Sequence, residues 1–223
     1  MKRIRTRFSS GGSVPEIHSD HERLRQVLAD RPVTKLHVGC GPRILKGWIN
    51  IDLAFEPFER YLQYYGDEFY SEEVRGGRSD FFALDVTREG IPFDDNTVDV
   101  IFHEDFIEHL DQRGQILFLA ETLRVLKPGG VHRVNTPDLT ESMRRHSTFS
   151  RGAVGVYIDE WDRHGHKSVL TSAMLTEMAM MVGYRDLRLT KRDSSASDLL
   201  PNEYRPDPRD REEWGNIFAD LMK

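Results

Sequence analysis

The chain has 223 residues, 38% of them hydrophobic and 30% charged, and its formal net charge is −6. This length suffices for one well-packed α/β domain and is too short for two ordinary domains joined by linkers. Because an acidic chain has no overall attraction to a phosphate backbone, the charge argues against a nucleic-acid partner.

Cys40 is the only cysteine, which excludes an intramolecular disulfide and a zinc site built from cysteines. No apolar run approaches the roughly 18 residues that span a bilayer, and none follows the basic start as it would in a signal peptide. We therefore expect a cytoplasmic protein that has no membrane partner.

The first segments of the chain predict an N-terminal extension over residues 1–33 and a main domain over residues 34–223. Residues 1–15 are polar and rich in Ser and Gly, which predicts a flexible lead-in. Residues 18–30 carry apolar side chains at helical spacing, and Arg31-Pro32 predicts the end of that helix.

Short apolar runs and helical patterns alternate along the main domain. The expected strands cover 35–41, 48–53, 81–86, 98–105, 131–137 and 184–192, and the expected helices cover 114–126 and 168–183. Residues 216–223 could form a seventh strand or a short helix, and 127–130 (KPGG) indicate a turn. This alternation predicts a single-domain α/β fold, Rossmann-like and doubly wound, with a mainly parallel seven-stranded sheet.

Two further segments are expected to lack regular structure. Residues 148–166 are expected to form a loop or insertion of the kind that covers a ligand, and residues 201–214 hold three prolines and should be irregular.

Glycines and acidic residues follow the first three strands, where open α/β sheets bind ligands. In Gly39-Cys40-Gly41 the glycines let the backbone approach a ligand, because no Cβ stands in the way. Asp52 could accept hydrogen bonds from both hydroxyls of a ribose. Asp85 could accept one from an adenine amino group, or could instead cap the next turn through Thr87. These residues describe a nucleoside pocket.

A dinucleotide ligand is disfavoured, since Ile44 stands where the G-x-G-x-x-G fingerprint needs its third glycine.

The order HVGCG, INIDL, ALDV, IPFDDNTVDVIFHEDFIEHL and LRVLKPGG resembles the class I S-adenosylmethionine (SAM)-dependent methyltransferases, and most of all the small "methyltransferase type 11" domains. The resemblance is strong over residues 35–138 and weaker to residue 190. It implies an enzyme with SAM as cofactor, the glycine loop lining its methionine part, Asp52 its ribose, and Asp85 and Val86 its adenine. The full predicted cofactor set is His37, Gly39, Cys40, Gly41, Asp52, Leu53, Asp85, Val86, His103 and Glu104.

Three departures from the family pattern leave an alternative open. His37 replaces the acid that often precedes the glycine loop, Arg43 stands near its usual later glycine, and the short spacing to Asp52 predicts a very short or absent first helix. The alternative is a binding module that keeps the fold and has lost catalysis.

A dense polar group follows the fourth expected strand. Methyl transfer to a hydroxyl or ammonium group needs an acceptor that loses a proton, so we predict a general base, with His109, Asp105 and His166 as candidates in that order. Glu108 and His109 could instead only cap and orient the next helix, and no metal site is expected. The predicted acceptor is an O or N atom of a small molecule or sugar.

Overall fold

The computed structural model describes residues 20–28, 32–63, 66–67, 70–147, 158–200 and 215–223. The predictions for residues 1–15, for 148–157 of the expected insertion and for 201–214 lie outside the described residues. No helix in the described part of the chain is long and apolar enough to cross a membrane.

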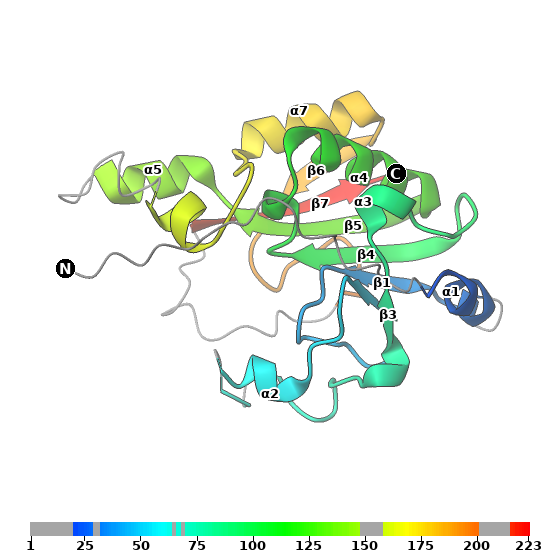
Figure 1. Ribbon diagram of the computed structural model, residues 1–223. Helices are drawn as coiled ribbons and strands as arrows, with labels where there is room; N and C mark the ends of the chain where they lie inside the picture. Colours follow the sequence, from blue (N-terminus) through cyan, green and yellow to red (C-terminus); the bar gives the residue numbers. More distant parts are fainter. Residues whose placement is uncertain (1–19, 29–31, 64–65, 68–69, 148–157, 201–214) are drawn as a thin grey trace, which may run out of the picture.

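The described residues form one seven-stranded sheet in the order β3-β2-β1-β4-β5-β7-β6 (Figure 1). Neighbouring strands run parallel, except that β7 runs antiparallel to both β5 and β6. This topology confirms the predicted fold class and shows that the last segment is a strand. The bounds are β1 Lys35–Val38, β2 Ile49–Asp52, β3 Phe81–Ala83, β4 Val98–Glu104, β5 Leu126–Pro137, β6 Asp186–Leu189 and β7 Asn216–Met222.

Helices and short helical turns connect the strands. The α-helices are α1 His21–Leu28, α2 Phe58–Tyr61, α3 Val86–Glu89, α4 Gln112–Val125, α5 Leu139–Ser147 and α7 Ser172–Val182. Two 3₁₀ turns, η2 Arg78–Asp80 and η3 Ile107–His109, and a π-helix, η4 Ile158–Arg163, complete them. Figure 1 shows α4 and α7 side by side on one side of the sheet and α2 on the opposite side.

The two faces of the sheet are buried differently. Leu24 of α1 joins the main core together with apolar residues of the sheet, α4 and α7. On the other face, Trp48, Tyr61 and Tyr70 belong to a second cluster with Phe102, in which Trp48 contacts Phe102 and the two tyrosine rings contact each other. Because α1 contributes to the main core, it packs on the main domain, while the division after residue 33 stays a prediction.

Two sequence-based boundaries need correction. The expected turn at 127–130 lies inside β5, because Leu126 already pairs with Val98 and the register shifts before Val131 pairs with Val100. The helix expected from residue 168 begins at Ser172, because Leu170 bridges Asp138. The prediction about the first helix is confirmed, since residues 39–48, all of them described, form no helix.

Candidate cofactor and acceptor site

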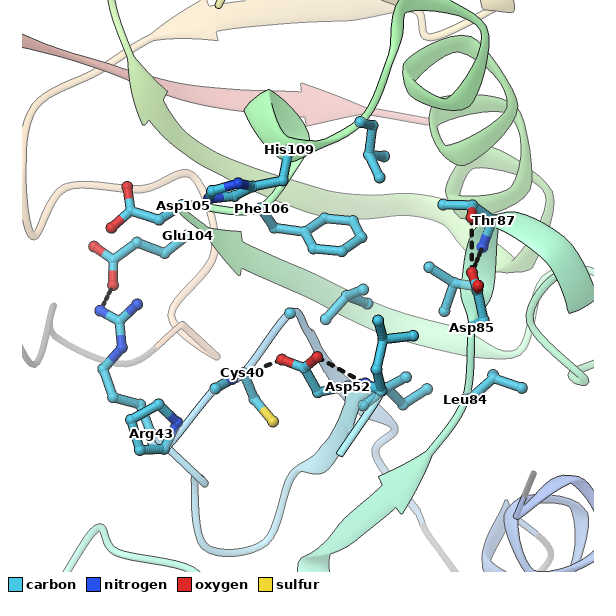
Figure 2. Close-up of a pocket in the computed structure, with 18 of the residues that line it drawn as sticks. Cys40, Arg43, Asp52, Leu84, Asp85, Thr87, Glu104, Asp105, Phe106 and His109 are labelled. Atoms are coloured by element: carbon cyan, nitrogen blue, oxygen red, sulfur yellow. Dashed lines mark hydrogen bonds and ion pairs between the residues drawn. The ribbon is translucent and has the colours of Figure 1, made fainter. Parts of the chain in front are cut away.

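A cavity of about 580 Å³ opens at the carboxyl ends of β1, β2, β3 and β4. Its size falls within the range of small-molecule sites, roughly 300–1,000 Å³. Figure 2 shows Asp85 at one end of the cavity, Asp105 and His109 at the other, and Asp52 between them. The strand order reverses between β1 and β4, which is where doubly wound sheets bind ligands.

The glycine loop forms one wall of the cavity and is held by the neighbouring strand. The N–H groups of Gly39 and Cys40 both donate to the carbonyl of Ile51, at 2.8 and 3.3 Å. Gly39 has φ +64°, and a Cβ at this position would lie 2.4 to 2.7 Å from three side-chain carbons of Phe106. Only glycine therefore lets this wall pack against Phe106, which also lines the cavity.

Asp52 ends β2 and points into the cavity (Figure 2). Its Oδ2 accepts from Gly41 N–H at 2.8 Å and its Oδ1 accepts from Leu53 N–H at 2.7 Å. Burial raises the pKa of Asp52 above its usual value, and these two hydrogen bonds act in the opposite direction. A carboxylate has about four acceptor positions, so each oxygen retains capacity for one more donor.

Asp85 caps the next turn and also lies at the cavity wall. Its Oδ1 accepts from both the N–H and the hydroxyl of Thr87, at 3.1 and 2.7 Å, which caps α3. The same residue lines the cavity between Leu84 and Val86. Capping therefore fixes the carboxylate at the cavity wall instead of removing it from the site.

Glu104 at the end of β4 is 2% exposed and forms an ion pair with Arg43. Its other oxygen accepts from Asn135 Nδ2 at 3.3 Å. The next residue, Asp105, has φ +52°, a left-handed conformation that is strained for a residue with a Cβ and is often found at functional sites. Both acids line the cavity.

His37 and His103 do not line the cavity, although both were predicted to bind the cofactor. His37 stacks on Phe102 with ring centres 5.0 Å apart, and its Nδ1 is 3.1 Å from Asn50 Oδ1. His103 is fully buried beside His132. For His103 the reason is strand alternation: the neighbouring Glu104 faces the cavity, so His103 faces the other way. Neither histidine is part of the cavity wall.

These buried histidines predict an acid-sensitive fold. Burial lowers the pKa of His37 and of His132 from 6.5 to about 3, so the unfolded chain binds more protons between these values. Their contribution to stability is complete above pH 6.5 and is lost as the pH falls toward 3, at about 1.4 kcal/mol per pH unit for each histidine. Urea unfolding at several pH values would measure the slope.

His37→Phe, which keeps the stacking on Phe102, serves as the matched variant for that slope. It should show a weaker fall in unfolding free energy below pH 6 than the wild-type chain. Identical slopes for the two proteins would contradict the assignment.

The predicted catalytic residues meet at the far end of the cavity. His109 is exposed and lines the cavity with Asp105, whereas His166 lies behind it, 7% exposed, with the two imidazole rings 4.9 Å apart. Partial desolvation of the imidazole ring, followed by the electrostatic effect of the nearby His166 ring, lowers the pKa of His109, so its neutral form is favoured. Glu108 is fully buried in the same group.

Sequence reasoning missed several residues of this region. Phe106 and Lys167 line the cavity, and Glu160 lies next to His166 with Oε2 3.1 Å from Nδ1. Only Phe106 has a detectable signal, since it comes two residues after the end of β4. Nothing in the sequence associates Glu160 with a site.

Comparison with known proteins finds methyltransferases. Residues 36–134 match a family model described as a methyltransferase domain. A protein of Mycolicibacterium smegmatis described as a probable SAM-dependent methyltransferase is 32% identical over 170 residues, which cover 74% of this chain. The chain is therefore similar in sequence to SAM-dependent methyltransferases. It spans 57% of the length of that relative.

Solved methyltransferase structures support the same fold. A SAM-dependent methyltransferase from Archaeoglobus fulgidus superposes with a TM-score of 0.52 at 16% identity, covering 91% of this chain and 92% of that chain. One from Mesorhizobium loti gives a TM-score of 0.52 at 12% identity, covering 91% and 97%. At such identities the likeness concerns the fold alone.

The two ends of the cavity differ in how they relate to the matched family model. The glycine loop, Asp52, Asp85 and Glu104 all lie inside the matched residues 36–134. His166 and Lys167 lie outside that range, so the Asp105–His109 end is built in part from chain that the family model does not describe.

Proposed function

We propose that this chain binds SAM in the cavity and transfers its methyl group to an O or N atom of a small-molecule or sugar acceptor. The observation that carries the proposal is Asp52, a carboxylate oriented by two backbone N–H groups beside the glycine loop. Such a carboxylate suits the two hydroxyls of a ribose. The cavity offers no glycine-rich turn leading into a helix between β1 and β2, so a pyrophosphate has no matching site there.

The proposed cofactor contacts are the predicted residues that line the cavity. Leu53 and Val86 offer apolar surface on either side of the adenine position beside Asp85, and Gly39, Cys40 and Gly41 lie next to the methionine part. Cys40 is fully buried, and burial raises the pKa of its thiol, which suits packing and not nucleophilic attack. Glu104 would border the methionine part together with its partner Arg43.

Methyl transfer depends mainly on holding the acceptor atom close to the methyl group of SAM. The sulfonium of SAM already activates the methyl group, so the acceptor lone pair forms the new bond as the carbon–sulfur bond breaks. The acceptor also loses a proton. We propose that the group of His109, Asp105 and His166 activates the acceptor at that end of the cavity, with His109 and Asp105 in contact with it.

Removing an acceptor-end side chain should separate catalysis from cofactor binding. We expect His109→Ala to lower kcat by about 10²- to 10⁴-fold, the usual range for loss of a group that assists proton removal, and to change SAM affinity less than about threefold. Transfer of labelled methyl from SAM to a panel of hydroxyl and amine acceptors, sugars included, would measure it. His21→Ala, on α1 and paired with Glu89, is the control. Full turnover in His109→Ala would remove His109 from the proposal.

The second candidate function is a binding module without catalysis. The Arg43–Glu104 ion pair favours it, because the pair lies in the cavity beside the glycine loop and occupies space there. In that case SAM binding would be weak, and the Arg43→Ala substitution would strengthen it. Methyl transfer to any acceptor in the panel would exclude this candidate.

A further inference from the structure

Three metal-ligating side chains converge at the acceptor end of the cavity. Glu108 and His109 come from η3, and His166 follows η4. Each offers one ligand atom, and the three atoms lie within 4.8 Å of one another. Glu108 and His166 are buried and His109 is exposed on the cavity wall.

Glu108 is anchored at both its side chain and its backbone. Its Oε2 accepts from the Thr136 hydroxyl at 2.9 Å, and its Oε1 lies 4.0 Å from His166 Nε2. The N–H groups of Lys167 and Ser168 donate to its backbone carbonyl at 2.8 and 3.1 Å. The segment that carries His166 is therefore hydrogen-bonded directly to Glu108, which holds the two side chains together.

His166 has the second partner that metal-binding histidines typically have. Its Nδ1 is 3.1 Å from Glu160 Oε2, and the other oxygen of Glu160 accepts from the Ser142 hydroxyl. A histidine ligand commonly donates its second ring N–H to a carboxylate, which fixes the tautomer and aims the other nitrogen at the ion. With Nδ1–H donating to Glu160, His166 Nε2 would be the nitrogen that binds an ion, and it lies 4.0 Å from Glu108 Oε1.

We propose that Glu108, His109 and His166 bind one divalent cation of the first transition series. Two imidazoles and a carboxylate without sulfur suit Mn²⁺, Fe²⁺, Co²⁺ or Zn²⁺ better than Mg²⁺. Bonds of about 2.1 Å at tetrahedral angles place ligand atoms about 3.4 Å apart, so the site must close slightly, and the exposed His109 can move. Glu160 positions His166 and does not touch the ion.

The role of the cation rests on the proposed function. Three protein ligands leave at least one coordination position open, and His109 places that position at the cavity wall. An acceptor hydroxyl on the ion would lose its proton more readily, because the positive charge stabilises the alkoxide. The three side chains would then activate the acceptor through the ion, with Asp105 beside it to take the proton.

The test is direct binding of Mn²⁺ to the tag-free, chelator-treated full chain. We expect one ion per chain, measured by calorimetry and by loss of the electron paramagnetic resonance signal of free Mn²⁺. His109→Ala and Glu108→Gln should each weaken binding at least tenfold, and Glu160→Gln by about 10- to 100-fold. His21→Ala changes a half-buried histidine whose carboxylate partner lies elsewhere, and it should leave Mn²⁺ binding unchanged.

Thermal melting of the variants and a parallel titration with SAM distinguish the possible outcomes. His109 is exposed, so its substitution leaves the core intact, and thermal melting confirms that each variant is folded. Absence of binding, or equal binding by the wild type and by folded His109→Ala, would overturn the cation site. SAM is titrated in parallel: SAM binding without Mn²⁺ binding refutes the cation alone, and Mn²⁺ binding without SAM binding refutes the proposed function alone.

Discussion

Asp52→Ala is expected to weaken SAM binding by about 100-fold. The wild-type carboxylate would accept from two ribose hydroxyls, and hydrogen bonds to a charged group contribute about 1.5 to 3 kcal/mol each. Two such bonds at the lower limit amount to about 3 kcal/mol, which corresponds to about two powers of ten in affinity. The substitution also removes the acceptor of the Gly41 and Leu53 N–H groups, which loosens the loop beside the cofactor. Calorimetric titration of both proteins measures the change.

Asp186→Asn is the control for that loss. Asp186 is an exposed acid on β6, paired with Arg188 and absent from the cavity wall. Its substitution should leave SAM affinity unchanged. Equal affinities of Asp52→Ala and the wild type would contradict the placement of the ribose at Asp52.

Gly39→Ala is expected to lower the unfolding free energy by about 3 kcal/mol. The new Cβ would meet Phe106 carbons at 2.4 to 2.7 Å, and the nearest part of that side chain includes its own Cβ, so the backbone must shift. Overpacking costs about 1 to 3 kcal/mol, and a left-handed φ adds about 1 to 2 kcal/mol for alanine. For a domain of this size the melting temperature should fall by about 10 °C.

Gly41→Ala separates the cost of overpacking from the cost of the left-handed backbone. Gly41 also has a left-handed backbone, at φ +50°, but a Cβ there meets nothing within 4 Å. This variant should lose only the backbone contribution, about 1 to 2 kcal/mol. SAM affinity should fall in Gly39→Ala because Phe106 lines the cavity. Equal melting temperatures for the two variants would show that contact with Phe106 does not matter.

The strands and their terminal acids could be predicted because each depends on local pattern. Buried parallel strands form short apolar runs, and an acid such as Asp52 directly after a run must lie at the ligand-binding edge. The missing first helix could be predicted from spacing alone. The start of β5 could not, because Lys127 to Gly130 join the sheet only through a register shift opposite Val98.

The direction of individual side chains was the main information that the sequence lacked. Because β4 is buried on both faces, its run shows no alternation of apolar and polar residues, and His103 and Glu104 look equivalent. The partners of Glu108 and His166 are a second example. Thr136 donates to Glu108 and Glu160 lies next to His166, and only the folded chain brings these separate elements together.

Equilibrium dialysis of the wild-type chain against labelled SAM tests the central claim most directly. The account predicts one SAM per chain, displaced by excess unlabelled SAM and not by excess NAD, since the glycine loop leads into no helix that could hold a pyrophosphate. Failure to retain SAM, or equal displacement by NAD, would contradict the assignment of this cavity as the cofactor site.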